Sequence, residues 1–406
     1  MNDLTKGNSP FHPGQPVPLD LFVGRVAELQ HIMVRGAGQV TRGKPIAIFV
    51  EGEYGIGKSS FAGYVQASAE REHNLHGIYA SLGRCRTVDE MAADILEATI
   101  RSGALNPGRS EKIKNWLARY VGQQSLFSFS VNLQTLKEDA LQLTSTDNLL
   151  SFLRDVHNRL QDTGIMGISL VLDEINGIVD DPRFAPFIKS IVDSNALSRS
   201  PLPLLLMICG VPEKRGDMIR SHEPVARIFD VVEIGALKEN ETQEFFEHAF
   251  QTVQMKVDPA AMDLMVYFSA GFPKIMHLIG DAAYWIDRDA VVDESDAVVA
   301  IRMAAEEVGK RFVDQQVYEA LKSDTYKAIL QKISGTDPGS LSFLKRDIEE
   351  TLTENEKKKF NNLLQKMKQL HVLRTGEVRG EYIFNMRMVR LYLFLQSKRL
   401  SKPQSN

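Results

Sequence analysis

Short apolar runs alternate with amphipathic segments through the first 237 residues of the chain. The run at 45–51 (Pro-Ile-Ala-Ile-Phe-Val-Glu) is partly β-branched and ends in a glycine-rich turn, as a strand buried on both faces would. A helical stretch at 58–70 follows it. Strands alternating with helices predict an α/β fold with a doubly wound, five-stranded parallel sheet. The four further strands are expected at 77–82, 168–173, 204–209 and 230–234, with helices at 88–101, 148–161, 183–193 and 213–221 between them.

The segment 103–145 interrupts this alternation and is predicted to be an insert. It contains a helical pattern at 110–121, and residues 126–133 alternate apolar and polar side chains like a half-exposed strand. Two interpretations stay open for the insert, an ornament on the edge of the sheet and a contact surface for a partner.

After residue 237 the pattern becomes helical, which predicts three domains in all. The sheet domain spans 19–237, a helical lid domain 238–313 and a winged-helix-like domain 314–400, between a flexible lead-in at 1–18 and a flexible tail at 401–406. The lid helices are expected at 240–253, 259–269, 273–288 and 293–312. The last domain is expected to contain helices at 317–333, 343–352 and 354–370, a hairpin at 372–384 and a helix at 386–396.

Composition is that of an ordinary globular protein. The chain has 406 residues, 43% hydrophobic and 25% charged, which allows two to four domains. The longest apolar run, 202–211, contains Pro203 and is about half of the ~20 residues that cross a bilayer, and the first residues lack an apolar signal region. Two cysteines, Cys85 and Cys209, are too few for a disulfide framework. We therefore expect a cytoplasmic protein without a membrane partner.

Charge is unevenly distributed along the chain. Residues 354–402 hold twelve lysines and arginines against four glutamates, a net charge of +8, whereas the whole chain carries −4. This asymmetry hints at an acidic partner for the C-terminal part, although a lysine-rich face is most often simply solvated.

The strongest motif is a G-x-x-x-x-G-K-S sequence between the first predicted strand and the first predicted helix. In this context its glycines let backbone N–H groups surround a phosphate at the positive end of the helix. Lys58 then bridges the β- and γ-phosphates, and the Ser59 hydroxyl is placed to coordinate Mg²⁺. The residues expected to bind ATP here are Gly52, Glu53, Tyr54, Gly55, Ile56, Gly57, Lys58, Ser59 and Ser60.

The second motif is a buried strand that ends in two carboxylates, Asp173 and Glu174. Asp173 is expected to hold the water shell of Mg²⁺, and Glu174 to orient or deprotonate a water aimed at the γ-phosphate. A base beside the metal carboxylate favours hydrolysis over phosphate transfer to a small molecule. The nine histidines are scattered and predict no metal cluster.

With these motifs in this order, the sequence resembles the AAA+ ATPases, and more narrowly the branch shared by origin-recognition initiators and prokaryotic STAND-like ATPases. The resemblance covers about residues 20–398. Besides the two motifs, it rests on Leu-Phe-Val-Gly-Arg at 21–25, Gly-Phe-Pro at 271–273 and the winged-helix-like end.

The resemblance implies roles for residues outside the two motifs. Phe22, Val23 and Gly24 would lie near the adenine, Lys274 would reach the γ-phosphate as a second sensor, and Arg227 would be an arginine finger that reaches a neighbouring subunit. Simpler alternatives are core packing for Phe22 and Val23, a solvated lysine at a helix start, and a surface ion pair for Arg227.

Two features depart from the family pattern. The fourth strand ends in Met-Ile-Cys-Gly at 207–210, where the family offers Asn, Thr or Ser to polarise the attacking water, so slow turnover is expected. Asp173 also lies 115 positions after Lys58 because of the insert, which favours the STAND-like branch.

Two functions from different classes fit these patterns. The first is a Mg²⁺-dependent ATPase whose nucleotide state controls homo-oligomerisation and engagement of double-stranded DNA; the alternative is a nucleotide-dependent switch that acts on a partner effector protein. The helix 354–370 has one apolar stripe and a cationic face, as a recognition helix needs. The residues expected at the DNA are Lys358, Lys359, Lys366, Arg374 and Arg379, with Arg387 beside them.

Overall fold

The computed structural model describes residues 6–14, 18, 21–102, 107–121, 144–319, 321, 323–336 and 339–401. The chain divides into two compact units. One comprises residues 16–235, and the other residues 236–406 together with 1–15. Each unit is described by itself.

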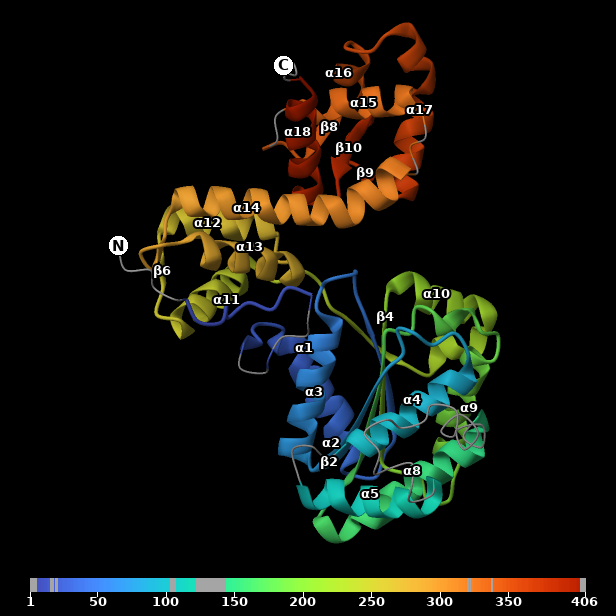
Figure 1. The fold of residues 1–406 in the computed structure, drawn as a ribbon. Helices are drawn as coiled ribbons and strands as arrows, with labels where there is room; N and C mark the ends of the chain where they lie inside the picture. The colour runs from blue at the N-terminus through green and yellow to red at the C-terminus, as the bar shows by residue number, and fades with distance from the viewer. Residues whose placement is uncertain are drawn as a thin grey trace. The chain divides into compact units, whose positions relative to one another are not determined.

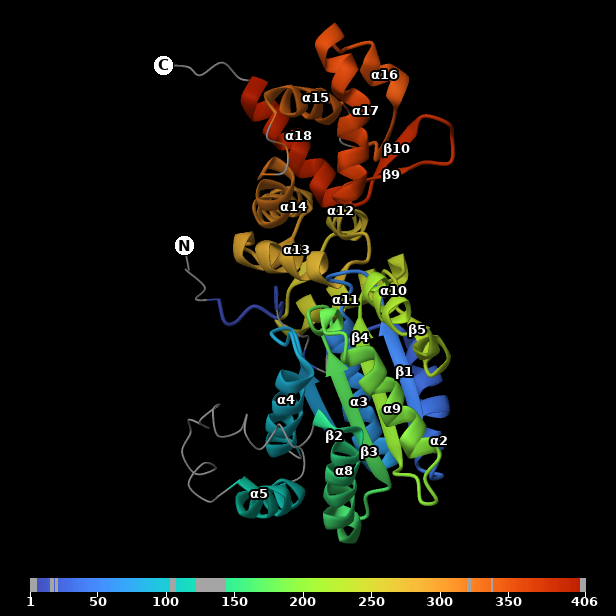
Figure 2. The same ribbon diagram turned by 90° about the vertical axis from the view of Figure 1, so that its right-hand side faces the viewer.

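The first unit is built on five parallel strands in the order β2-β3-β4-β1-β5 (Figures 1 and 2). This is the predicted α/β sheet, with all five strands where the apolar runs placed them to within two residues. β1 lies between β4 and β5, and all of its residues after Ile46 are buried, so it is covered on both faces. The strands are β1 (Ile46–Glu51), β2 (Leu75–Ser81), β3 (Gly167–Asp173), β4 (Leu204–Gly210) and β5 (Asp230–Glu233).

Helices cover both faces of this sheet because alternate strand residues face opposite ways. Phe49, Leu170 and Leu206 belong to one buried cluster with the helices α4, α8 and α9, whereas α3 packs against η2 and against β2, β3 and β4.

The segment 26–40, for which we predicted no helix, forms α1, η2 and α2. The helices are α1 (Val26–His31), the π-helix η2 (Ile32–Ala37), α2 (Gly38–Val40), α3 (Lys58–His73), α4 (Val88–Arg101), α8 (Thr146–Leu160), α9 (Phe184–Ala196) and α10 (Pro212–Ser221).

The described part of the insert is one helix, α5 (Pro107–Val121), against α4 and α8. Its Trp116 ring lies 5.7 Å from the Phe152 ring of α8, so this helix adds to the core. The strand predicted at 126–133 lies outside the described residues.

The second unit begins with four helices, in the order that the sequence predicts. α14 ends at Val308, and a ten-residue π-helix, η7, continues from it to Tyr318. The end near 312 and the start of the next helix at 317 that we predicted are therefore wrong. That helix, α15, begins only after Ser323. The elements are α11 (Glu239–Thr252), α12 (Pro259–Ser269), α13 (Pro273–Ile286), α14 (Glu294–Val308) and η7 (Gly309–Tyr318), with a small parallel pair β6 (Lys256–Val257) and β7 (Val291–Val292).

The N-terminal segment packs on these helices, in contrast to the flexible lead-in that we predicted for 1–18. Phe11 is 3% exposed, and its ring lies 4.9 Å from Phe250. Gly280 of α13 makes room for it, since a Cβ there would lie 2.2 Å from the Phe11 ring. The Phe11 ring and the hydrogen bond from the His12 backbone N–H to His277 thus hold a segment whose composition predicts disorder.

The last elements follow the order helix, strand, helix, helix, strand, strand, helix. The helix predicted at 343–352 is wrong at its start, because Phe343 pairs with Tyr382 in a three-stranded antiparallel sheet of order β8-β10-β9. The elements are α15 (Asp324–Ser334), β8 (Ser342–Leu344), α16 (Lys345–Glu349), α17 (Glu354–Gln369), β9 (Leu373–Thr375), β10 (Glu381–Phe384) and α18 (Arg387–Ser401).

Within the described ranges, no helix has both the length and the apolar character needed to span a membrane. Cys85 and Cys209 are free and buried.

Candidate functional site

The glycine-rich loop joins the carboxyl end of β1 to the first turn of α3. Gly55 and Gly57 have φ values of +79° and +89°, a conformation that glycine adopts without strain. A Cβ at Gly52 would lie 2.5 Å from the carbonyl oxygen of Ile234, so the loop starts where only a bare backbone fits beside the end of β5. The backbone therefore turns at the helix N-terminus, where N–H groups and the helix dipole favour an anion.

Lys58 is folded back onto this loop. Its Nζ atom donates hydrogen bonds to the carbonyl oxygens of Gly52 at 2.8 Å and Glu53 at 2.9 Å. Burial lowers the pKa of the ammonium group, while the nearby carboxylate of Asp173 acts in the opposite direction. A phosphate bound in the loop would give the Lys58 ammonium group an anionic partner, which is a stronger acceptor than the two carbonyl oxygens.

Asp173 ends β3 and is 2% exposed. Its Oδ2 atom accepts a hydrogen bond from the Tyr79 hydroxyl at 2.6 Å, and its Oδ1 atom accepts one from the backbone N–H of Glu174 at 2.8 Å. The Tyr79 hydroxyl also lies 3.4 Å from the carbonyl oxygen of Ser59. One phenol thus contacts both residues predicted to hold Mg²⁺, whose hydroxyl and carboxylate oxygens are the ligands that this hard cation prefers. No cluster of three or more metal-ligating side chains occurs in the described parts of the chain.

Glu174 has a left-handed backbone, with φ +57°, at the turn after β3. A non-glycine residue in this conformation is strained by about 1–3 kcal/mol, and such strain is common at functional sites. The Oε2 atom lies 3.4 Å from the Ser81 hydroxyl, and a Cβ at Gly83 would lie 2.4 Å from Oε2. The absence of a side chain at Gly83 therefore leaves room for the Glu174 carboxylate.

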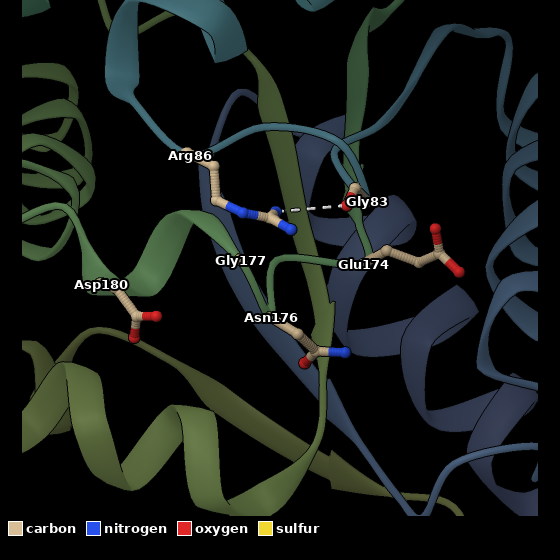
Figure 3. A pocket seen from close by; sticks show the side chains of 6 residues that line it. All are labelled: Gly83, Arg86, Glu174, Asn176, Gly177 and Asp180. Atoms are coloured by element: carbon tan, nitrogen blue, oxygen red, sulfur yellow. Dashed lines mark hydrogen bonds between the residues drawn. The ribbon is translucent and has the colours of Figure 1, made fainter. Parts of the chain in front are cut away.

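A polar pocket of about 380 Å³ lies beside Glu174 (Figure 3). Arg86 is one of its lining residues and donates to the carbonyl oxygens of Cys85 at 2.9 Å and Gly83 at 3.4 Å. Its guanidinium covers Gly177, where a Cβ would lie 1.9 Å from Nη1. Sequence reasoning missed Arg86; the only signal was its place after a parallel strand. The pocket is lined by Gly83, Arg86, Glu174, Asn176, Gly177 and Asp180.

Asn176 connects this pocket to the end of β4. Its Oδ1 atom accepts a hydrogen bond from the backbone N–H of Val211 at 3.4 Å. Cys209, at the position where the resemblance predicts a polar residue, is completely buried, and burial raises the pKa of its thiol well above the usual value. The end of β4 therefore has an uncharged thiol, and the amide beside it comes from the β3 loop. The sequence analysis did not single out Asn176.

Phe22, Val23 and Gly24 lie beside the phosphate loop. The Phe22 ring stacks on Tyr64 of α3 with centroids 4.4 Å apart. Arg25 is buried and donates to the carbonyl oxygens of Ile56 and Gly57 in the loop. The segment 22–25 is thereby fixed against the loop and its helix, although no predicted role singled out Arg25.

Arg227 ends the 3₁₀ helix η6 (Glu223–Arg227) and is exposed. The structure shows no ion pair for it with any described residue. The neighbouring Arg215 of α10 instead pairs with Glu51, with an Nε–Oε2 distance of 2.5 Å, directly before the phosphate loop. The surface ion pair considered for Arg227 is therefore absent from the described structure.

Lys274 is the second residue of α13, in the other unit. Burial lowers the pKa of its ammonium group, with Arg311 lowering it further and Glu307 opposing. Its predicted approach to the γ-phosphate remains a prediction.

The basic residues predicted to contact DNA differ in exposure. Lys358 of α17 and both Arg374 and Arg379 of the β9–β10 hairpin are exposed, whereas Lys366 is half-buried. Lys359 is half-buried and donates to the Thr325 hydroxyl at 3.3 Å, so it also supports the packing of α17 on α15.

Arg387, which we expected at the phosphates, contacts α12 in the described structure, and its approach to DNA stays a prediction. Its guanidinium is stacked over the Tyr267 ring, 3.9 Å from the centroid, and it donates to the carbonyl oxygen of Tyr267. Its role in the described structure is to join α18 to α12, since a stacked guanidinium favours a fixed partner.

No protein-family model matches the sequence, and no curated protein matches it. Solved structures do match. A Walker-type ATPase of Pyrococcus abyssi is 16% identical with a TM-score of 0.56, and the match covers 92% of this chain and 96% of that one. The Aeropyrum pernix ORC2 protein, solved as ADPNP–ADP complexes, is 13% identical with a TM-score of 0.58, and the match covers 97% of this chain and 96% of that one.

At these identities the comparisons show the fold. The parallel order β2-β3-β4-β1-β5, with the phosphate loop after β1 and the carboxylate pair after β3, is the arrangement of a P-loop NTPase. We conclude that residues 16–235 of this chain have the P-loop NTPase fold, and that the structural match to the Pyrococcus and Aeropyrum proteins extends over nearly the whole chain.

Proposed function

We propose that the protein is a Mg²⁺-dependent ATPase of the AAA+ type, with slow turnover, whose nucleotide state controls self-association and engagement of double-stranded DNA. The observation that carries the proposal is the position of Lys58. Its Nζ atom is held on the carbonyl oxygens of the loop, in a turn that presents N–H groups, and its pKa responds to the charge of Asp173. The nucleotides in the Aeropyrum ORC2 structure support the same ligand.

The residues of the site divide the chemistry between them. The loop and Lys58 bind the β- and γ-phosphates, and the 22–24 segment borders the adenine. Ser59 and Asp173 would hold Mg²⁺, which when bound neutralises charge on the phosphates. Glu174 accepts the proton of the attacking water, and the Asn176 amide orients that water in place of a polar group on β4. Slow turnover is proposed because β4 itself ends in the buried thiol of Cys209.

Two variants test the ATPase. Lys58→Ala should abolish binding of a fluorescent ATP analogue, because it removes the charge that contacts the phosphates. Glu174→Gln should keep binding and stop phosphate release, because only the base is lost. The matched control is Asp180→Asn, an exposed carboxylate of the same pocket that pairs with Lys214. Full hydrolysis by the Glu174→Gln protein would disprove the assigned base.

Self-association is proposed from Arg227. Its exposed guanidinium is available to a neighbouring subunit, and an arginine finger can contribute about 10³–10⁵ in rate. Mass photometry with and without ATP measures the assembly. A mixture of Lys58→Ala and Arg227→Ala subunits, each inactive alone, should recover activity because one interface then holds both groups. A monomer with a rate independent of protein concentration would exclude this role.

DNA engagement is proposed from the region 354–402, whose net charge of +8 includes the exposed Lys358, Arg374 and Arg379. The order of α15, β8, α16, α17, β9 and β10 also supports a winged-helix domain. Anisotropy of a labelled duplex at several salt concentrations tests it, with Lys358→Glu/Arg379→Glu as the variant and Glu239→Lys, on an exposed part of α11, as the control.

The second candidate, a nucleotide-dependent switch on a partner effector protein, is favoured by one observation. The buried Cys209 leaves β4 without a polar group for catalysis. A chain that binds ATP tightly, hydrolyses it almost not at all and binds no duplex would favour this function.

A further inference from the structure

The exposed face of α17 carries four side-chain amides. Asn361, Asn362, Gln365 and Gln369 are all exposed, and their spacing of one, four and eight residues from the first places them along one side of the helix. The opposite side faces the core of the domain. We call these four residues the amide face; the buried residues of the other side are Phe360, Leu363, Leu364 and Met367.

The fold does not use these amides. None of the four makes a side-chain hydrogen bond to another residue in the described ranges. Asn195 is an example of an amide with a structural role. It is buried, its Nδ2 atom donates to the carbonyl oxygen of Leu202, and its Oδ1 atom accepts from the backbone N–H of Leu202. The donors and acceptors of the amide face are therefore directed to solvent, with their bonding capacity available to a ligand.

Cationic side chains border the amide face. Lys358 lies one turn before Asn362 and is exposed without a side-chain partner among the described residues. Lys366 and Lys368 lie on its two sides along α17. The only acidic group on the same side, Glu354, is neutralised by Lys357 at 2.9 Å. The amide face thus has neutral donors and acceptors at its centre and positive charges at its edges. This arrangement is complementary to a polyanion that presents neutral donors and acceptors between its charged groups.

We propose that the amide face reads adenine bases in the major groove, so that the protein prefers A·T pairs at the centre of its DNA site. This inference rests on the proposed engagement of DNA. Asn and Gln form paired hydrogen bonds with N6 and N7 of adenine, whereas Arg and Lys are the usual partners of guanine. From Asn361 to Gln369 the helix rises about 12 Å, which corresponds to about four base pairs.

The presence of amides beside the lysines distinguishes recognition of adenine bases from simple attraction to phosphates. Lysines alone would bind any duplex with a salt-dependent affinity and no base preference. A helix meant only for phosphates has no need of four adjacent amides without partners. The amide face therefore supplies specificity, and its lysine border supplies affinity.

The test selects binding sites from 30-base-pair duplexes with a randomised centre, with ATP and Mg²⁺ at low salt, using the full chain. Wild type should enrich A·T pairs over about four central positions, with at least about tenfold discrimination in anisotropy titrations against a G·C-centred duplex. The variant Asn361→Ala/Asn362→Ala/Gln365→Ala/Gln369→Ala should lose this discrimination and keep the salt dependence. Its fold is checked by circular dichroism, and alanine favours the helix.

A gain-of-function variant tests the inference without relying on the loss of A·T discrimination. Gln365→Arg should move the preference at one position toward G·C, because arginine pairs with guanine. If wild type binds duplexes without A·T preference, or if the alanine variant keeps the preference, the inference is wrong while DNA engagement stands. If no duplex binds even at low salt, DNA engagement itself fails, and the amide face would belong to a protein partner.

Discussion

The Tyr79 hydroxyl lies 2.6 Å from Oδ2 of Asp173, and it is the only side-chain hydroxyl on that carboxylate among the described residues. Tyr79 stands on β2, the strand next to β3 in the sheet, in register with Val171. Burial raises the pKa of the phenol, and the adjacent Asp173 charge raises it further, so it stays a donor. Tyr79, which belongs to no sequence motif, thus orients the candidate metal ligand Asp173.

Tyr79→Phe should weaken the response to Mg²⁺. Loss of an outer-shell partner typically costs about 10–100-fold in metal affinity, so the Mg²⁺ concentration for half-maximal ATPase activity should rise by about tenfold. Tyr64→Phe, a ring on α3 whose hydroxyl has no side-chain bond in the described structure, is the matched control. An unchanged Mg²⁺ titration would show that Asp173 needs no orienting phenol.

Asn176→Ala should lower kcat by about tenfold or more with little change in the affinity for ATP. The amide is expected to act on the water and not on the nucleotide, so the effect belongs to the chemical step. Single-turnover hydrolysis and binding of a fluorescent ATP analogue measure the two quantities. Adding Cys209→Ser, which places a hydroxyl at the end of β4, should recover part of the rate. A variant with normal kcat would remove Asn176 from the mechanism.

Phe11→Ala and Gly280→Ala should both destabilise the helical unit. The first leaves a cavity worth about 3–5 kcal/mol, and the second places a Cβ 2.2 Å from the Phe11 ring. Because the clash needs the ring, the double variant should be more stable than the sum of the two effects predicts. Chemical unfolding measures all three. Gly63→Ala, in open space on α3, is the control and should not destabilise.

The stability of the same unit should fall on acidification. Burial, with a smaller effect from His12, lowers the pKa of His277 from 6.5 to about 4, and His277 Nδ1 accepts a bond from the His12 backbone N–H at 3.1 Å. The rings of Phe11 and Phe245 complete its surroundings. Between pH 6.5 and 4 the unfolded chain binds a proton that the native state does not, so stability is full above pH 6.5 and is lost toward pH 4.

The loss from His277 amounts to about 3 kcal/mol over this range. His277→Asn should therefore flatten the pH dependence of unfolding between pH 7 and 4.5, whereas His248→Asn, on the exposed side of α11, should leave it unchanged. His76 in the other unit has a pKa lowered to about 4, chiefly by burial, so its protonation acts on the stability of that unit. Equal slopes for wild type and His277→Asn would contradict the assignment.

The sequence by itself determined the sheet and the phosphate loop. Buried parallel strands must be apolar on both faces, and a loop around a phosphate must have glycine at its left-handed positions, so both leave local patterns such as 45–51 and Gly57. Asp173 and Glu174 were predictable for the same reason, since the carboxyl ends of parallel strands share one edge. The capping box at Thr353 likewise fixed the start of α17.

Only the tertiary structure decided which residues surround those motifs. The Tyr79 hydroxyl contacts Asp173, which lies 94 positions later in the chain. Phe11 packs on the helices because Gly280, also far along the chain, has no side chain. Phe343 lies in a strand because Tyr382 pairs with it, although its neighbours have a helical pattern. Such contacts depend on partners distant in sequence, and local propensity is too weak to encode them, because packing routinely overrides a few tenths of a kcal/mol per residue.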